Sequence, residues 1–403
     1  MLYPLLRVWT RLALQFYFKK IEVSGVEKIP QDGPLLLLAN HPNSFMEACL
    51  LSCFQPRELN YLVRGDLFEK KWLKPILDAT HQIPIYRMKD GIANLKKNKS
   101  SFSISYEILK KEKAILLFPE ASTLYVPFLR PLQKGAARLV TGAKEENDIS
   151  GLKVICCSVH YTDAFSWRSN VYLKFSELLD VDQYYKKAED KSDHLTRLTD
   201  QFAYMLRTQH FDYRETEPRI HLDHLVSIVE SKHKAHCSEK INSILEQNQD
   251  AEERTLLTQD LKLYHQGQKS FFADRFATRS VALHLILLLF YFVVSIPSII
   301  VLIPVFYLIH KAVSRKIKHK EFVPPISVAA NMVYHLLIST LVLISFTSIC
   351  NFWFGLGAFI ILQFSLYASS LLKDKLKLVR LFLNEETKGR YAQYLNIINK
   401  YNI

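Results

Sequence analysis

Residues 34–47 read PLLLLANHPNSFME and place an apolar strand directly before a histidine and a carboxylate. The run of leucines is typical of a strand that is buried on both faces, as the strands of parallel sheets are. His41 follows the expected strand, and Glu47 stands six residues further on, at the start of an expected helix. A strand, a short turn and a helix in this order predict an α/β arrangement.

The chain on either side of this stretch repeats the same alternation. Short apolar runs are expected to be strands, and longer amphipathic runs are expected to be helices. The expected strands are residues 35–39, 60–63, 83–86, 114–118, 154–159 and 171–175. The expected helices are residues 69–80, 92–111 and 135–142. The alternation predicts an α/β fold with a mixed sheet flanked by helices.

The composition excludes several classes of protein. Hydrophobic residues make up 49% of the 403 residues, which is far more than a disordered chain contains. Six cysteines without a C-x-x-C pair or zinc-type spacing argue against a disulfide scaffold and a structural metal, and favour a reduced, cytosolic environment. The net charge of +13 favours anionic partners. Because the basic residues cluster beside apolar segments, membrane lipid explains them better than nucleic acid does.

Two long segments near the C-terminus, residues 280–310 and 322–372, contain no Asp, Glu, Lys or Arg. Runs longer than about 18 apolar residues indicate membrane-spanning helices. The second run is long enough for a helical hairpin of residues 325–350 and 354–372. The hairpin is preceded by Lys311, Arg315, Lys316, Lys318 and Lys320 and followed by Lys373, Lys375, Lys377 and Arg380. The positive-inside rule then places both of its ends, and the active domain, on the cytoplasmic face.

The first apolar run is compatible with two arrangements. Basic residues precede and follow it, so that a single crossing leaves positive charge on both sides of the membrane. Pro297 and Pro304 are able to bend the run into a shallow re-entrant pair. The alternative is one long tilted span with a weak charge signal.

The N-terminus predicts a membrane contact of a different kind. Residues 1–20 interleave apolar side chains with Arg7 and Arg11, which is typical of a helix that lies in the membrane interface. The alternative is an ordinary helix that covers the soluble core. The expected organisation is an interfacial helix (1–20), an α/β domain (21–175), a polar helical insert (176–275), a transmembrane region (280–372) and a cytoplasmic tail (373–403).

His41 and Glu47 have the chemistry of a general base and the carboxylate that orients it. An imidazole can take a proton from an alcohol when a carboxylate fixes its tautomer and stabilises its charged form. The spacing also fits a capping box, Ser44-x-x-Glu47, in which the carboxylate bonds the backbone at the start of the helix. A carboxylate has two oxygens, so the two roles are compatible.

Two further strand ends bring polar groups towards the same edge of the sheet. Arg87 follows the strand at residues 83–86, and Glu120 and Ser122 follow the strand at residues 114–118. Lys134 precedes a helix that begins with Gly135, a combination suited to an anion. An arginine such as Arg87, taken alone, is more often a surface ion-pair partner, here of a residue such as Asp90.

In this order the motifs resemble the membrane-associated glycerophosphate acyltransferase family, which includes the glycerol-3-phosphate and lysophosphatidate acyltransferases. The resemblance covers about residues 20–175 and rests on Val23-x-Gly25, Pro30, Gly33-Pro34, Asn40-His41, Pro84-x-Tyr-Arg87 and Phe118-Pro-Glu120. The sequence departs from the family at several places. The block at Arg87 lacks the usual Gly and Phe before the arginine, and the strand block at residues 154–159 lacks its Pro. The fifth position after the histidine, usually Asp, is Met46 and the acid is Glu47, and Ala121 stands where Gly commonly follows Pro-Glu.

The resemblance implies an O-acyltransferase of phospholipid biosynthesis. Such an enzyme moves a fatty acyl group from a thioester, either acyl-CoA or an acidic acyl carrier protein, to a hydroxyl of glycerol 3-phosphate or 1-acylglycerol 3-phosphate. The catalytic residues would be His41 and Glu47, and the substrate-binding residues would be Arg87, Glu120, Ser122 and Lys134. Since the thioester is already activated, no metal and no cofactor is expected. The rival hypothesis is a non-catalytic membrane scaffold with a degenerate acyltransferase domain.

Overall fold

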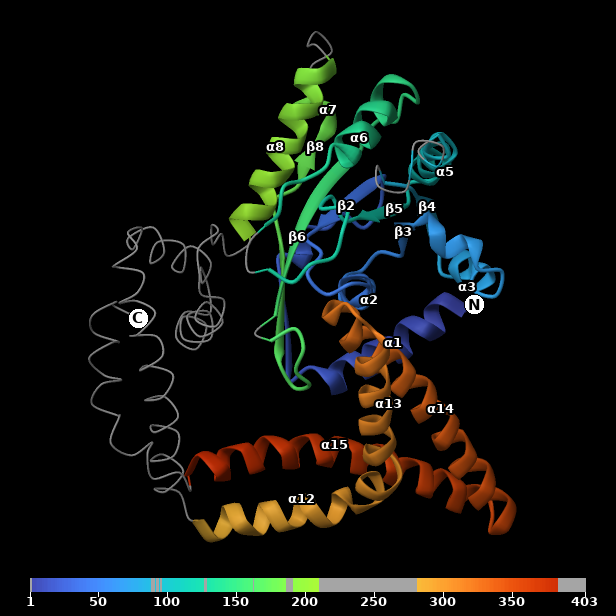
Figure 1. The fold of residues 1–403 in the computed structure, drawn as a ribbon, viewed down its shortest axis with the longest axis vertical. Helices are drawn as coiled ribbons and strands as arrows, with labels where there is room; N and C mark the ends of the chain where they lie inside the picture. Colours follow the sequence, from blue (N-terminus) through green and yellow to red (C-terminus); the bar gives the residue numbers. More distant parts are fainter. Residues whose placement is uncertain are drawn as a thin grey trace, which may run out of the picture. The chain divides into compact units, whose positions relative to one another are not determined.

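The computed structural model describes residues 2–87, 91, 94, 96–126, 129–161, 163–185, 191–209 and 281–382. The chain divides into two compact units, residues 1–215 and residues 216–403. The first unit contains a sheet and the helices on its two faces, and the described part of the second consists of apolar helices (Figure 1).

The centre of the first unit is an eight-stranded sheet in the order β1-β7-β6-β2-β5-β3-β4, with β8 paired to β6. The strands are β1 (Lys20–Ser24), β2 (Leu35–Ala39), β3 (Leu59–Arg64), β4 (Gln82–Ile85), β5 (Ala114–Leu117), β6 (Lys153–Tyr161), β7 (Asn170–Phe175) and β8 (Leu179–Asp180). Strand β2 lies between β5 and β6 and runs parallel to both, whereas β6 and β7 are antiparallel. The mixed sheet and all six of the predicted strands are therefore confirmed.

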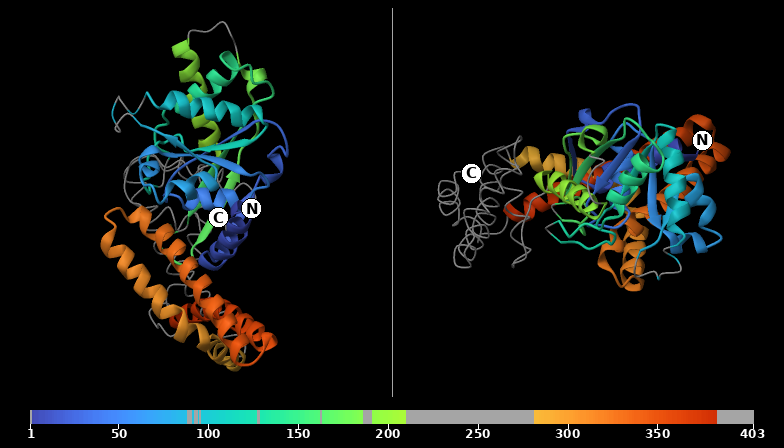
Figure 2. Two further views of the ribbon diagram at one scale, coloured as in Figure 1. Left: turned by 90° about the vertical axis from the view of Figure 1, so that its right-hand side faces the viewer. Right: turned by 90° about the horizontal axis from the view of Figure 1, so that it is seen from above.

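The first unit has helices on both faces of this sheet (Figure 2). They are α1 (Leu2–Tyr17), α2 (Met46–Cys53), α3 (Lys74–Ala79), α5 (Asn98–Lys110), α6 (Gly135–Glu145), α7 (Val181–Tyr184) and α8 (Lys191–Gln209), with the 3-10 turns η1 (Val26–Lys28) and η2 (Gly65–Glu69). Leu36 and Leu38 of β2 pack in one cluster with Leu109 of α5, Leu139 of α6 and Phe202 of α8. Since side chains alternate along a strand, Leu35 and Leu37 are buried on the opposite face, which completes the two-sided burial expected of this strand.

Helix α1 packs on the sheet domain with some of its side chains and leaves other apolar side chains exposed. Tyr3 and Leu14 are buried, and the Tyr3 hydroxyl is 3.0 Å from the Tyr61 hydroxyl of β3, so one side of the helix covers the sheet domain. Leu5, Val8 and Leu12 are exposed on the same helix. An exposed apolar stripe at this spacing is what a helix in the membrane interface presents to lipid.

Several helix boundaries differ from the predicted ones. The helix expected at residues 69–80 is split into η2 and α3, and α3 starts at Lys74 because Pro75 fits only the first turn of a helix. The helix expected from residue 92 is regular only from Asn98, and residues 92, 93 and 95 lie outside the described part. The edge strand β1 and the two-residue strand β8 were not predicted, since neither is an uninterrupted apolar run.

The beginning of the polar insert expected at residues 176–275 packs within the first unit. Strand β8 pairs with β6, and α8 buries Leu198, Phe202 and Leu206 in the core of the sheet domain. The long amphipathic pattern of α8 therefore serves to cover the sheet. Residues 210–275 of the expected insert lie outside the described residues.

The described part of the second unit consists of α12 (Val281–Val301), α13 (Ile303–Lys316), η4 (Lys320–Phe322), α14 (Val323–Ile349) and α15 (Phe352–Phe382). By length and composition, two of these helical segments are able to cross a membrane, Lys320–Ile349 and Phe352–Lys373. They correspond to the two arms of the predicted hairpin. The Asn351 side chain accepts hydrogen bonds from the backbone N–H groups of Trp353 and Phe354, so it caps the helix that follows the turn.

The first apolar run forms two helices with a bend of 53° between them. The break is at Leu302, two residues before Pro304, which lies in the first turn of α13, whereas Pro297 lies inside α12. The carbonyl of Val301 beside the break accepts a 2.8 Å hydrogen bond from the hydroxyl of Tyr334 on α14. Because a free carbonyl is costly away from water, this bond stabilises the bent form. A bent span and a re-entrant pair both remain compatible with the bend.

Candidate active site

His41 and Glu47 form a hydrogen-bonded pair at the carboxyl end of β2. The distance between His41 Nδ1 and Glu47 Oε2 is 3.0 Å. The His41 side chain is 17% exposed and the Glu47 side chain is 0% exposed, so the imidazole is reached from outside while its partner is not. The extra residue and the extra methylene relative to the usual family spacing therefore do not prevent the pair from closing.

The polypeptide around His41 is fixed by asparagine side chains. Asn40 Nδ2 donates to the carbonyl of Val159 at 2.9 Å, and Asn40 Oδ1 accepts from the N–H of Val159 at 2.7 Å. This pair of bonds continues the β2–β6 ladder by one residue beyond Ala39. Asn43 Nδ2 donates to the carbonyl of Ala164, which holds the turn after His41 against the segment that follows β6.

Glu47 also bonds the backbone of the turn, as a capping residue does. Its Oε1 accepts a 2.8 Å hydrogen bond from the N–H of Asn43. The expected capping box on Ser44 is not formed, because the residue before α2 is Phe45 and Ser44 is in the left-handed region with a φ of 57°. Since Oε2 remains on the imidazole, Glu47 acts on the turn and on His41 at once.

Tyr161 supplies the third hydrogen bond to Glu47 and was not predicted from the sequence. Its hydroxyl donates to Glu47 Oε1 at 2.8 Å from the end of β6. Burial raises the pKa of Glu47, and the hydrogen bonds from His41, Tyr161 and the Asn43 backbone act in the opposite direction. The expected strand ended at residue 159, two residues before this tyrosine.

The segment after β5 encloses His41 from the other side. The ring of Phe118 stacks on the imidazole, with ring centres 4.1 Å apart and 14° between the planes. Glu120 Oε2 accepts the backbone N–H of His41 at 2.9 Å, and the N–H of Leu124 donates to the carbonyl of His41 at 3.4 Å. The predicted Phe118-Pro-Glu120 motif and the His41 motif therefore meet at one edge of the sheet, as expected from strand order.

Two arginines approach the turn that contains Ser122. Arg87 Nη1 donates to the carbonyl of Ala121 at 3.3 Å, which brings this predicted residue to the same turn. Arg130 Nη1 donates to Ser122 Oγ at 2.7 Å, and Arg130 Nη2 pairs with Glu120 Oε2 at 2.8 Å. Arg130 was not predicted, because no pattern in the loop before residue 134 distinguishes it from a surface arginine. Asp90, the alternative partner of Arg87, lies outside the described residues.

One family of known proteins matches the part of the chain that carries this site. The family model described as "Acyltransferase" matches residues 20–160, which include the His41–Glu47 pair and the Glu120 turn. The match lies within the first unit and does not include the apolar helices of the second. The family expected from the motifs is thereby confirmed for this part of the chain.

Two individual proteins are similar to the acyltransferase domain. A 1-acyl-sn-glycerol-3-phosphate acyltransferase of Bacillus subtilis (strain 168) is 23% identical over 124 residues, which cover 31% of this chain and 58% of that protein. The match therefore spans little more than half the length of the relative. The crystal structure of the 1-acyl-sn-glycerophosphate (LPA) acyltransferase PlsC from Thermotoga maritima has a TM-score of 0.36 at 16% identity, covering 52% of this chain and 80% of that chain.

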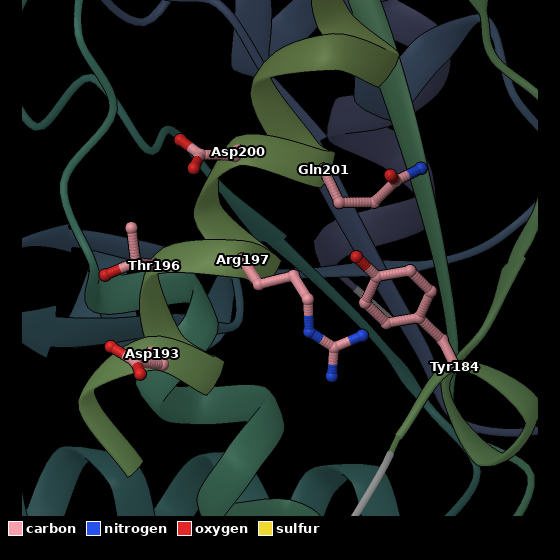
Figure 3. Close-up of a pocket in the computed structure, with 6 residues that line it drawn as sticks. All are labelled: Tyr184, Asp193, Thr196, Arg197, Asp200 and Gln201. Carbon is pink, nitrogen blue, oxygen red and sulfur yellow. The ribbon is translucent and has the colours of Figure 1, made fainter. Parts of the chain in front are cut away.

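Lys134 has its hydrogen-bond partner elsewhere on the acyltransferase domain. Its Nζ donates to Thr196 Oγ1 on α8 at 2.8 Å, and not to the turn at Ser122. Thr196 lines a polar hollow of about 480 Å³ between the end of α7 and α8 (Figure 3). The other residues that line it are Tyr184, Asp193, Arg197, Asp200 and Gln201. The guanidinium of Arg197 lies 4.8 Å from the centre of the Tyr184 ring, in a cation–π contact between two residues that line the hollow.

The site combines an imidazole bonded to a buried carboxylate with a turn that two arginines contact. Within the described residues, no group of three or more His, Cys, Asp and Glu side chains is placed to hold a metal ion. Burial raises the pKa of the thiols of Cys49, Cys53, Cys156 and Cys157, which keeps them in the unreactive thiol form. His41 is therefore the group in this region that is best suited to activate a hydroxyl.

Proposed function

We propose that this protein is a membrane-bound O-acyltransferase that moves a fatty acyl group from an acyl thioester to a glycerol phosphate acceptor. The acceptor is glycerol 3-phosphate or 1-acylglycerol 3-phosphate, and the donor is acyl-CoA or an acyl carrier protein. The observation that carries the proposal is the 3.0 Å contact between His41 and Glu47 inside an acyltransferase-family domain. The similarity to a lysophosphatidate-type relative supports the choice of acceptor.

The proposed reaction starts at His41 Nε2. An ionised carboxylate only accepts hydrogen bonds, so Glu47 requires the ring hydrogen to be on Nδ1 and leaves a lone pair on Nε2. Nε2 takes the proton of the acceptor hydroxyl while the hydroxyl oxygen attacks the thioester carbonyl. A new C–O bond forms, the C–S bond breaks, and the thiolate recovers the proton from the imidazolium. The carboxylate of Glu47 stabilises the imidazolium between these two steps.

The acceptor phosphate is assigned to the turn that carries Ser122. Arg87 reaches this turn at Ala121, and a guanidinium offers the N–H fork that matches phosphate oxygens. Lys134, which is exposed and bonded to Thr196, would add positive charge further from the turn. Glu120 was expected to contact the acceptor, but both of its oxygens already accept hydrogen bonds from the chain itself.

The membrane is proposed to retain the acylated product, and to supply the acceptor if this is 1-acylglycerol 3-phosphate, because glycerol 3-phosphate is water-soluble. The described helices Lys320–Ile349 and Phe352–Lys373 are long and apolar enough to cross a bilayer, and the exposed leucines of α1 suit its interface. The basic residues around the second apolar run favour a cytoplasmic orientation of both hairpin ends. A cytoplasmic acyltransferase domain would meet soluble acyl-CoA or acyl carrier protein directly.

The test is an acylation assay on detergent-purified full-length protein with His41→Ala. We expect acyl transfer to fall by about 10²–10⁴-fold, since this is the usual contribution of a general base. The acceptor panel is glycerol 3-phosphate, dihydroxyacetone phosphate, 1-acylglycerol 3-phosphate and lysophospholipids. His81→Ala is the matched control, because His81 stacks on Tyr3 of α1 and not on the site. If the wild type acylates none of these acceptors, the non-catalytic scaffold becomes the better hypothesis.

A further inference from the structure

Glu120 and Arg130 form an ion pair that is almost closed to solvent. Their side chains are 3% and 14% exposed, and Arg130 Nη2 lies 2.8 Å from Glu120 Oε2. The backbone N–H of Arg130 also donates to Glu120 Oε1 at 3.0 Å. Because charges are costly to bury, such a pair persists only where both partners are well bonded, and removing one partner leaves the other uncompensated.

The same carboxylate holds the backbone of His41. Glu120 Oε2 accepts the His41 N–H at 2.9 Å, on the oxygen that also bonds the guanidinium. The loop that contains Glu120 contacts His41 at two more points, since Phe118 stacks on its ring and Leu124 bonds its carbonyl. His41 is thus fixed by this loop at its N–H, its carbonyl and its ring.

Arg130 in turn fixes the loop. Its guanidinium donates to both the hydroxyl and the carbonyl of Ser122, across a turn in which Ala121 has a φ of 57°. A left-handed alanine is strained, so neighbouring contacts must hold it. Both Nη atoms of the guanidinium therefore donate hydrogen bonds within the protein. The buried Nε has no hydrogen-bond partner among the described residues.

We propose that Glu120 and Arg130 are a positioning pair that holds His41 in its reactive orientation, and that Glu120 does not contact the acceptor. The pair acts through the backbone of His41, while Glu47 acts through its ring. This inference rests on the proposed acyl transfer, because it states how the base of that reaction is held. Proton transfer requires the base to be aligned with the acceptor hydroxyl, so a small displacement of His41 should lower the rate of the reaction strongly.

The test is a double-mutant cycle of Glu120→Gln and Arg130→Met in the full-length protein. Each single variant is expected to lower kcat by about 10- to 100-fold and to leave the acceptor KM within about twofold. The double variant is expected to be no slower than the worse single variant, because both remove the same connection to His41. Arg64→Met is the matched control, since it breaks an exposed Arg–Asp pair with Asp66. It should not change kcat.

A conservative variant of Arg130 distinguishes the positioning role from a general loss of folding. Arg130→Lys keeps the charge beside Glu120 and loses the fork to Ser122, so it is expected to recover part of kcat and to retain the melting temperature. If Glu120→Gln instead raises the acceptor KM about tenfold while Arg130→Met leaves kcat unchanged, Glu120 binds the acceptor and the proposal is wrong. Independent, additive losses in the double variant would also overturn it.

A second readout does not depend on turnover. Diethyl pyrocarbonate modifies accessible imidazoles, and mass spectrometry of the peptide that contains residue 41 gives the rate for His41. Releasing the loop should increase this rate by about threefold or more in Arg130→Met but not in Arg64→Met. An unchanged rate at His41 overturns the positioning role. If the wild type shows no acyl transfer but the modification rate of His41 still increases in Arg130→Met, the proposed reaction is wrong. The positioning of His41 by the pair is then retained.

Discussion

The hydroxyl of Tyr161 donates a 2.8 Å hydrogen bond to Glu47 Oε1, although the two residues are 114 positions apart in the chain. Strand β6 lies beside β2 in the sheet, and β6 continues to residue 161, where the hydroxyl reaches the buried carboxylate. The donor opposes the effect of burial, which raises the pKa of Glu47. The end of strand β6 therefore favours the ionised form of the carboxylate that partners His41.

Tyr161→Phe should shift the pH dependence of acyl transfer. Loss of the donor removes stabilisation of the carboxylate, so the pKa of Glu47 rises further and more of it is protonated at a given pH. The acid limb of the kcat/KM profile should move to higher pH by about 1 to 2 units, since a hydrogen bond to a charged group contributes about 1.5–3 kcal/mol. Tyr172→Phe, a buried tyrosine of β7, is the control and should leave the acid limb in place. An unmoved acid limb in Tyr161→Phe would show that this hydroxyl does not act on the dyad.

Glu47→Gln should lower activity through the tautomer of His41. The amide oxygen can accept the bonds from Asn43 and Tyr161, so its NH₂ group must donate to His41 Nδ1 and drive the ring hydrogen to Nε2. The base is then blocked, and acyl transfer should fall by about 10²–10⁴-fold. The position of the hydrogen is measurable by ¹⁵N NMR of the imidazole. A variant with wild-type kcat would exclude Glu47 from orienting the base.

The same substitution should stabilise the fold at neutral pH. Burial raises the folded pKa of Glu47 above the ordinary value of a glutamate, so the favourable contribution of its protonated form is present at pH values below that ordinary value and is lost as pH rises through the folded pKa. Glu47→Gln avoids the buried charge, and its melting temperature should exceed that of the wild type at pH 7 and approach it as pH falls towards 4.5. Glu107→Gln, an exposed residue of α5, is the control and should show no such trend. A lower melting temperature for Glu47→Gln at pH 7 would contradict this sign.

The sequence predicts a contact in this site best where the two partners are close together along the chain. The His41–Glu47 pair is separated by six positions, and one strand-turn-helix pattern suffices to bring it together. Tyr161 was missed because apolar runs define the middle of a strand better than its end. Arg130 was missed because its role depends on a loop that doubles back on itself, and such loops leave no periodic pattern.

Lys134 has a contact that the sequence does not predict. Its position before Gly135 and a helix suggested an anion site, but a lysine side chain is long and its partner is chosen by packing. The contact with Thr196 follows from α8 lying beside α6, and α8 belonged to a segment expected to lie outside the sheet domain. The fold was therefore predicted well where strands are apolar and continuous, and less well where an amphipathic helix had two possible surfaces to cover.

Membrane topology is tested by cysteine labelling. In a background that lacks the six native cysteines, single cysteines at positions 316 and 375 should both be labelled from the cytoplasmic side. A cysteine at position 352, in the first turn of α15, should be labelled from the far side or be protected by lipid. Opposite labelling of positions 316 and 375 would mean an odd number of crossings between them and would refute the hairpin.

Arg87→Ala should impair the use of phosphorylated acceptors much more than it changes the KM of the acyl donor. A charged hydrogen bond contributes about 1.5–3 kcal/mol, so loss of the fork should cost roughly 10- to 150-fold in acceptor kcat/KM. Arg87→Lys should recover only part of the loss, because an ammonium keeps the charge but not the bidentate geometry. Arg64→Ala, which removes an exposed arginine from β3, is the control.

The alternative role for Arg87 is support of the turn, through its 3.3 Å hydrogen bond to the carbonyl of Ala121. In that case Arg87→Ala should lower the melting temperature and reduce the use of acceptor and donor equally, since a displaced turn disturbs His41 through Glu120. The two roles are therefore separated by the ratio of the two kcat/KM losses, measured on protein of known melting temperature. A stable variant with unchanged kinetics for both substrates would contradict both roles and would move the phosphate site towards Lys134 and Arg138.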